Sequence, residues 1–154
     1  MQGTAGRIVL GFVAAAISVL IVHQGIVYIL GTAGLTRTQP WSLQPLGYGP
    51  FAWIPVLANH IFWGGLWGIL FAFVYQRLPG TMMWLKGLIF GMLMLLVSNW
   101  TLLPMIRQYV FKYPPQPLFA GFNPTGIMVG LLIIGGFGIA LGVIYGLLAR
   151  ERNA

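Results

Sequence analysis

The chain has 154 residues, of which 58% are hydrophobic and 6% charged, with one acidic residue (Glu151), eight Lys or Arg residues and no cysteine. Soluble domains average about 45–50% apolar and ~25% charged residues, so this composition excludes a soluble globular protein. The lack of cysteine excludes disulfides and covalent c-type haem attachment, and the lack of carboxylates excludes most acid–base catalysis and cation coupling.

The net charge of +7 does not indicate nucleic-acid binding, because Lys and Arg are scattered singly and form no stripe. They separate uncharged stretches that are each long enough to cross a hydrocarbon core of ~30 Å as a helix. The sequence therefore predicts an all-α, polytopic membrane protein whose residues 1–154 form a single transmembrane domain, a bundle of four helices. Its first partner is the lipid bilayer, and enzyme activity is not expected.

The first predicted span covers residues 8–30. Its apolar run is longer than the 7–15 residues of a typical secretory signal, so it is expected to stay in the protein as a helix. An outer loop over residues 31–50 follows, rich in proline and aromatic residues, and residues 51–76 form the second predicted span.

The turn at Pro79-Gly80 predicts that span two is followed by an antiparallel partner. That partner is span three, over residues 83–103, and a second outer loop covers residues 104–124. Span four covers residues 125–149.

Four spans place both termini on one side of the membrane. The side of the termini carries Arg7, Arg77, Lys86, Arg150 and Arg152. The opposite side carries Arg37, Arg107 and Lys112. The positive-inside rule favours the side with more cations as the cytoplasmic one, so we expect both termini in the cytoplasm.

Aromatic residues gather at the outer ends of the spans and in the outer loops. They include Trp41, Trp53, Trp100, Tyr109, Phe111 and Tyr113. One interpretation is the interfacial aromatic belt that many membrane proteins carry. The other is a docking surface for a second membrane subunit, because both loops are too apolar to be simply solvated.

Small residues recur at every fourth position within the spans. The glycines of this pattern include Gly64 and Gly68 in span two, Gly87 and Gly91 in span three, and Gly130, Gly138, Gly142 and Gly146 in span four. Small residues at this spacing let helix backbones approach closely in lipid. We expect them to pack inside the bundle, and the alternative is that the span-four glycines receive a neighbouring subunit.

Span two carries the pattern His60-x-x-Trp63-Gly64-x-x-x-Gly68, with Tyr75 near its end. This pattern resembles small, mostly uncharacterised bacterial four-helix inner-membrane proteins. The resemblance covers span two and, loosely, span four. It implies a multi-pass location in a bacterial inner membrane and the four-span layout, and it implies no activity.

A few polar residues interrupt the apolar spans, and residues of this kind are candidates for function because they are costly in lipid. They are His23, Gln24, Asn59, His60 and Asn99. Spans one and two run in opposite directions, so His23 and His60 are expected at similar depth in the outer third of the bundle, with Asn99 near that level.

Three interpretations of this polar cluster stay open. The side chains can hold helices in register by hydrogen bonds, or line an outer vestibule for a small polar solute, a quinone head group or water. In the third interpretation, His23 and His60 are the axial ligands of a b-type haem, the one cofactor that the residues suggest. Two imidazoles without a carboxylate are too few for a closed zinc site.

These features favour a non-catalytic membrane protein, an accessory or scaffold subunit of a larger bacterial inner-membrane assembly. Its protein partners are then other membrane subunits or further copies of itself. The alternative is a small oligomeric solute channel or transporter with an outer polar vestibule. A haem-binding electron-transfer subunit is the third hypothesis.

Overall fold

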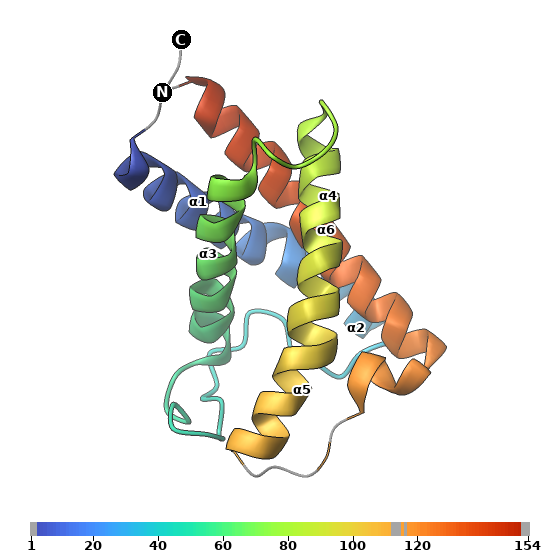
Figure 1. The fold of residues 1–154 in the computed structure, drawn as a ribbon. Helices are drawn as coiled ribbons and strands as arrows, with labels where there is room; N and C mark the ends of the chain where they lie inside the picture. Colours follow the sequence, from blue (N-terminus) through green and yellow to red (C-terminus); the bar gives the residue numbers. More distant parts are fainter. Residues whose placement is uncertain (1–2, 112–114, 116, 152–154) are drawn as a thin grey trace.

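The computed structural model describes residues 3–111, 115 and 117–151, and its regular structure is helical (Figure 1). This part of the chain contains no β-strand, only an isolated bridge between Pro45 and Pro55. The prediction of an all-α chain is confirmed. Three residues with predicted roles lie outside the described residues: Lys112 and Arg152, two of the cations used for the predicted orientation, and Tyr113 of the predicted outer aromatic surface.

Four helical rods make up the fold. The first rod consists of α1 (Thr4–Ser18), the π-helical turn η1 (Val19–His23) and α2 (Gln24–Thr32). The second rod is α3 (Val56–Val74). The third rod consists of α4 (Met83–Met94), π-helical η2 (Leu95–Leu102), α5 (Leu103–Met105) and π-helical η3 (Ile106–Val110). The short 3-10 helix η4 (Leu118–Phe122) precedes the fourth rod, α6 (Pro124–Glu151). Among the described residues, four helices are thus long and apolar enough to cross a membrane, as the sequence predicted.

The ends of two rods differ most from the predicted spans. Rod two begins at Val56, because Pro55 occupies the N-cap position and the preceding residues form turns. Rod three continues to Val110, beyond the predicted end at residue 103. Proline lacks an N–H and clashes with the carbonyl four residues earlier. The widened π-helical turns before and after buried Pro104 accommodate it within a continuous helix.

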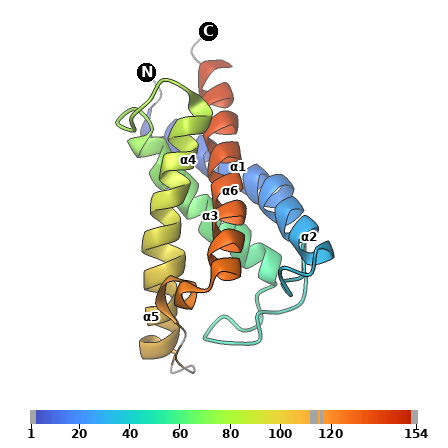
Figure 2. The same cartoon turned by 90° about the vertical axis from the view of Figure 1, so that its right-hand side faces the viewer.

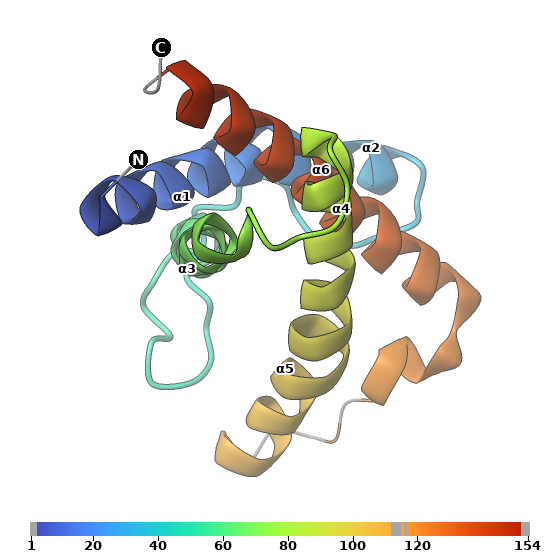
Figure 3. The ribbon, with the colours of Figure 1, turned by 45° about the horizontal axis from the view of Figure 1, so that its top comes forward.

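The rods are arranged as two crossed pairs. Figure 3 shows α3 beside α1 and α4 beside α6, and Figure 2 shows α6 between α4 and the first rod. The start of α1, the end of α6 and the link over residues 75–82 lie at one end of the molecule (Figure 1). The loop over residues 33–55 lies at the opposite end, which we call the outer end.

Glycines set the close contact between α4 and α6. Gly87 and Gly91 of α4 face Gly138 and Gly142 of α6, and a Cβ atom added to Gly87 would lie 2.8 Å from the Cα of Gly142. The two backbones therefore touch. In lipid, where burial of apolar side chains does not drive association, such contact is a main source of helix–helix attraction.

The other predicted packing glycines also face neighbours within the molecule. Gly68 meets the backbone of Gly11, which joins α3 to α1, and Gly64 faces Val19. Gly130 lies against Trp100, and Gly146 against Met83 and Tyr75. These glycines form contacts inside the bundle, so a neighbouring subunit would have to contact other residues of α6.

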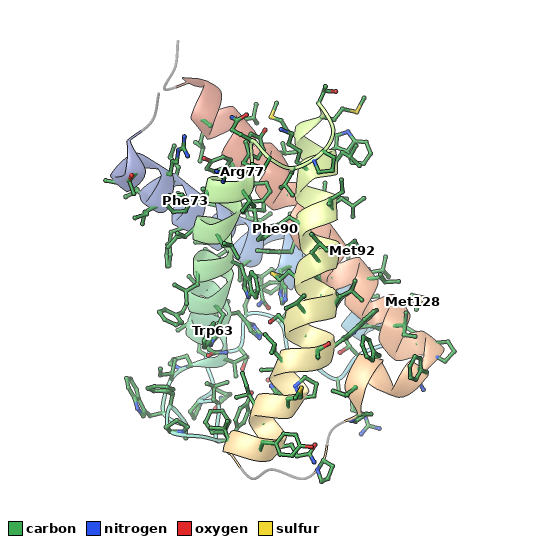
Figure 4. All side chains as sticks on the ribbon, in the orientation of Figure 1. Trp63, Phe73, Arg77, Phe90, Met92 and Met128 are labelled. Carbon is green, nitrogen blue, oxygen red and sulfur yellow. The ribbon has the colours of Figure 1, made fainter. Side chains whose placement is uncertain are left out.

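Aromatic rings fill the space between the two pairs. The fully buried ring of Phe71 lies 5.1 Å from Phe90 and 5.6 Å from Tyr145, measured between centroids. Figure 4 shows Phe90 in the space between α3 and α4. Edge-to-face contacts of this kind contribute about 0.5–1.5 kcal/mol each beyond the area that they bury.

Two cations stabilise the end of α3 that lies near the termini. Lys86 Nζ donates to the carbonyl oxygen of Tyr75 at 3.1 Å and lies 4.7 Å from the centroid of that ring. Arg77, labelled in Figure 4, donates to the carbonyl of Phe73 at 3.4 Å. The last carbonyls of a helix carry partial negative charge, so cations at this position are favourable.

Candidate functional site

The structure brings three of the five predicted site residues into contact. His23 ends η1, Gln24 begins α2, and His60 lies in the first turns of α3. The centroids of the two imidazole rings lie 5.3 Å apart, and the ring planes are tilted by 52°. Among the described residues, no hydrogen bond joins Asn59 or Asn99 to this group.

Gln24 is the centre of the group, which we call the Gln24 network. Its side chain is almost completely buried, with 2% of its surface exposed. The amide nitrogen lies 3.1 Å from Nδ1 of His60 and 3.4 Å from Nδ1 of His23. The amide oxygen accepts a hydrogen bond from the backbone N–H of Trp41 at 2.9 Å. One side chain thus ties the first rod, the second rod and the outer loop together.

The contact with Trp41 fixes the protonation of both histidines. A backbone N–H can only donate, so the Gln24 atom that it meets is the amide oxygen and the other atom is the NH₂ group. The NH₂ group donates to Nδ1 of each ring. A neutral imidazole that accepts at Nδ1 carries its proton on Nε2. We therefore infer that His23 and His60 are both neutral, with their N–H on Nε2.

A π-helical turn in the first rod provides a second anchor for Trp41. The backbone N–H of Gln24 bonds to the carbonyl of Val19, five residues earlier. An α-helical turn would have used the carbonyl of Leu20. That carbonyl is free to accept the indole N–H of Trp41 at 2.8 Å. The π-helical turn thus creates the acceptor that holds the loop, in line with the frequent occurrence of such turns at functional sites.

Trp41 was predicted only as a member of the outer aromatic surface. Its backbone has a φ of 48°, which side-chain-bearing residues rarely adopt, and its ring lies 6.2 Å from that of Tyr28. The loop is also tied to rod three, because Arg107 donates to the hydroxyl of Tyr48 at 2.9 Å. The loop therefore crosses the outer end from rod one to rod three. The role of Trp41 could not be predicted from the sequence, because neither its positive φ nor its contact with a residue 17 positions away is reflected in the neighbouring residues.

The geometry does not fit a haem held by His23 and His60. A histidine that binds a metal through Nε2 uses the lone pair of that atom and donates its Nδ1–H to a neighbour. Here both Nδ1 atoms accept from Gln24, so the lone pair needed by iron is absent from Nε2. The described residues also contain no group of three or more His, Cys, Asp or Glu that could hold a metal ion.

We predict that replacing Trp41 by Phe loosens the outer loop without unfolding the bundle. Phenylalanine keeps the aromatic ring but cannot donate to the Leu20 carbonyl. One net hydrogen bond contributes about 1 kcal/mol, so cleavage of the loop by a protease should accelerate roughly fivefold. Trp53→Phe is the matched control, because 75% of the Trp53 surface is exposed. Equal cleavage rates in the two variants would show that the indole contact does not hold the loop.

Comparisons with protein-family models, with curated proteins and with solved structures find no match to this chain. A fold of this kind does not by itself specify an activity, so function has to be inferred from the contacts of particular residues.

Proposed function

We propose that the chain is a non-catalytic integral membrane protein that serves as an accessory or scaffold subunit of a larger assembly in a bacterial inner membrane. Both termini would then lie in the cytoplasm, as the distribution of Lys and Arg favours. The four apolar helices support the membrane location. The bacterial membrane follows from the resemblance of the His60–Gly68 pattern alone.

The observation that carries the proposal is the way Gln24 is used. The side-chain amide of Gln24 makes hydrogen bonds with His23, His60 and the outer loop. Every enclosed side-chain nitrogen or oxygen in the described part of the chain has a hydrogen-bond partner. His23, Gln24 and His60 therefore link the first rod, α3 and the outer loop, which is a structural use of polar side chains. Hydrogen bonds between helices in lipid contribute about 0.6–2 kcal/mol each.

The outer end provides a surface for a partner subunit. Both outer loops expose large apolar side chains, among them Leu43 (74% exposed), Trp53 (75%) and Phe122 (77%). Large apolar side chains gathered outside the candidate spans are typical of protein–protein or membrane contact. A membrane subunit with an apolar outer loop is the kind of partner that fits.

The proposal predicts that the protein leaves its own membrane as part of a complex. After extraction in a mild detergent, native mass measurement should show other polypeptides at fixed stoichiometry. Trp53→Ser should reduce their recovery, whereas Trp84→Ser, the same change near the opposite end, should not. Recovery of the chain alone, or only with copies of itself, would contradict an accessory role.

A solute channel or transporter is the second candidate. The observation in its favour is that the rings of His23 and His60 are only partly buried, near the outer end. This candidate requires solute flux through vesicles that contain the purified chain alone, and a loss of that flux in His60→Ala. The accessory role predicts no flux above that of empty vesicles in either case.

A further inference from the structure

The Gln24 network leaves one N–H donor unused on each histidine. With Nδ1 of both rings accepting from Gln24, the proton of each neutral ring is on Nε2. Within the described residues, neither Nε2 atom has a hydrogen-bond partner, although every enclosed side-chain nitrogen and oxygen there has one. Neither Nε2 atom is therefore fully enclosed by the protein.

The two donors are close enough to serve one ligand. The ring centroids are 5.3 Å apart. Each Nε2 atom is about 1 Å from its own centroid, so the two N–H groups are within about 8 Å of each other. His60 lies in the first turns of α3, which places both donors toward the outer end of the candidate spans. At this depth an N–H group without an acceptor is costly.

We propose that His23 and His60 donate to the carbonyl oxygens of a membrane-resident amphiphile, either a quinone or the ester groups of a phospholipid. Both kinds of molecule carry two carbonyl groups, so each N–H donor can have its own acceptor on one ligand. A phosphate fits less well, because no Lys or Arg among the described residues is bonded to His23, Gln24 or His60. An anion without a cation is disfavoured in apolar surroundings at this depth of the candidate spans.

Gln24 has a positioning role in this site. Its buried amide holds both imidazoles in the tautomer that donates from Nε2. The link between Gln24 and Trp41 also makes the site continuous with the outer loop. Binding of an amphiphile goes beyond the proposed accessory role and does not depend on it.

The test uses the complete chain with ¹⁵N-labelled histidine in lipid nanodiscs, because the sequence contains only two histidines. Three membranes are compared: ether-linked phosphatidylcholine, which lacks the ester carbonyl, ester-linked phosphatidylcholine, and the ether-linked lipid with decylubiquinone. The Nε2–H proton resonances of both histidines should move downfield when a carbonyl accepts them.

Each outcome decides the proposal. A downfield shift with decylubiquinone identifies a quinone site, and a shift in ester-linked lipid alone identifies a lipid site. Unchanged resonances in all three membranes would mean that water alone takes these hydrogen bonds, and the proposal would be overturned.

Affinity provides the second measurement in the quinone case. His60→Phe keeps a ring but removes one donor, and the dissociation constant of decylubiquinone should rise about tenfold. Asn59→Ala is the matched control, because Asn59 is adjacent to His60 but has no bond with the Gln24 network. An equal affinity in His60→Phe and the original chain would contradict quinone binding by the histidines.

Discussion

Replacing Gly87 by Ala should destabilise the protein strongly, because the added methyl group has no room. The new Cβ would collide with the carbonyl oxygen of Gly138 and lie 2.8 Å from both the backbone nitrogen and the Cα of Gly142. All of these atoms belong to the backbone of α6, which cannot rotate away as a side chain could. Helices α4 and α6 must therefore separate, at a cost of about 3 kcal/mol. Unfolding of the detergent-solubilised protein, followed by circular dichroism, measures this loss.

Gly31→Ala is the matched control for this substitution. Gly31 is also helical, but an added Cβ there meets no atom within 4 Å. Alanine is favoured over glycine in helices, so this variant should be as stable as the original or more stable by up to about 1 kcal/mol. Equal stability of the two variants would contradict the direct backbone contact between α4 and α6.

The second large effect is expected from Gln24→Leu. Leucine has a similar volume and leaves no large cavity, so the loss comes from hydrogen bonds. The two histidines lose their common donor, and the backbone N–H of Trp41 loses its acceptor. Because these partly buried groups are left without a hydrogen-bond partner, the substitution should lower the free energy of unfolding by about 2–3 kcal/mol. The variant should melt earlier, and the outer loop should be cut faster by a protease.

Gln44→Leu tests whether this loss is specific. Gln44 is exposed in the same outer loop, so the identical change of side chain removes no buried hydrogen bond there. Its stability should remain within about 0.5 kcal/mol of the original chain. A Gln24→Leu variant as stable as Gln44→Leu would show that the network does not hold the helices together.

The number and type of the helices follow directly from the sequence, whereas their ends do not. Long uncharged stretches are a strong signal for helices that can cross a membrane. The predicted end of rod three was wrong because a proline usually ends a helix, whereas the helix continues through Pro104. The residues around Pro104 contain no pattern that predicts π-helical turns. Insertion into a membrane stays a prediction, and so does its direction, which rests on the positions of Lys and Arg.

The candidate site was predictable in part for a similar reason. Antiparallel spans place His23 and His60 at similar depth, but only helix rotation decides which side chains meet, and rotation depends on neighbouring helices. Asn99 was expected at the same depth for the same reason, but within the described part of the chain it makes no hydrogen bond with the Gln24 network. The role of Trp41 depends on a long-range contact and on a π-helical turn. Neither leaves a periodic pattern in the sequence.

The protonation of the two histidines is the decisive property to measure, because the role of Gln24 as a donor, the poor fit to haem and the proposed ligand site all depend on it. We would measure the ¹⁵N spectrum of histidine-labelled protein in lipid at neutral pH. Both rings should be neutral, with the proton on Nε2 and with Nδ1 close to the Gln24 amide protons. A proton on Nδ1 of either ring, or rings remote from Gln24, would contradict the account.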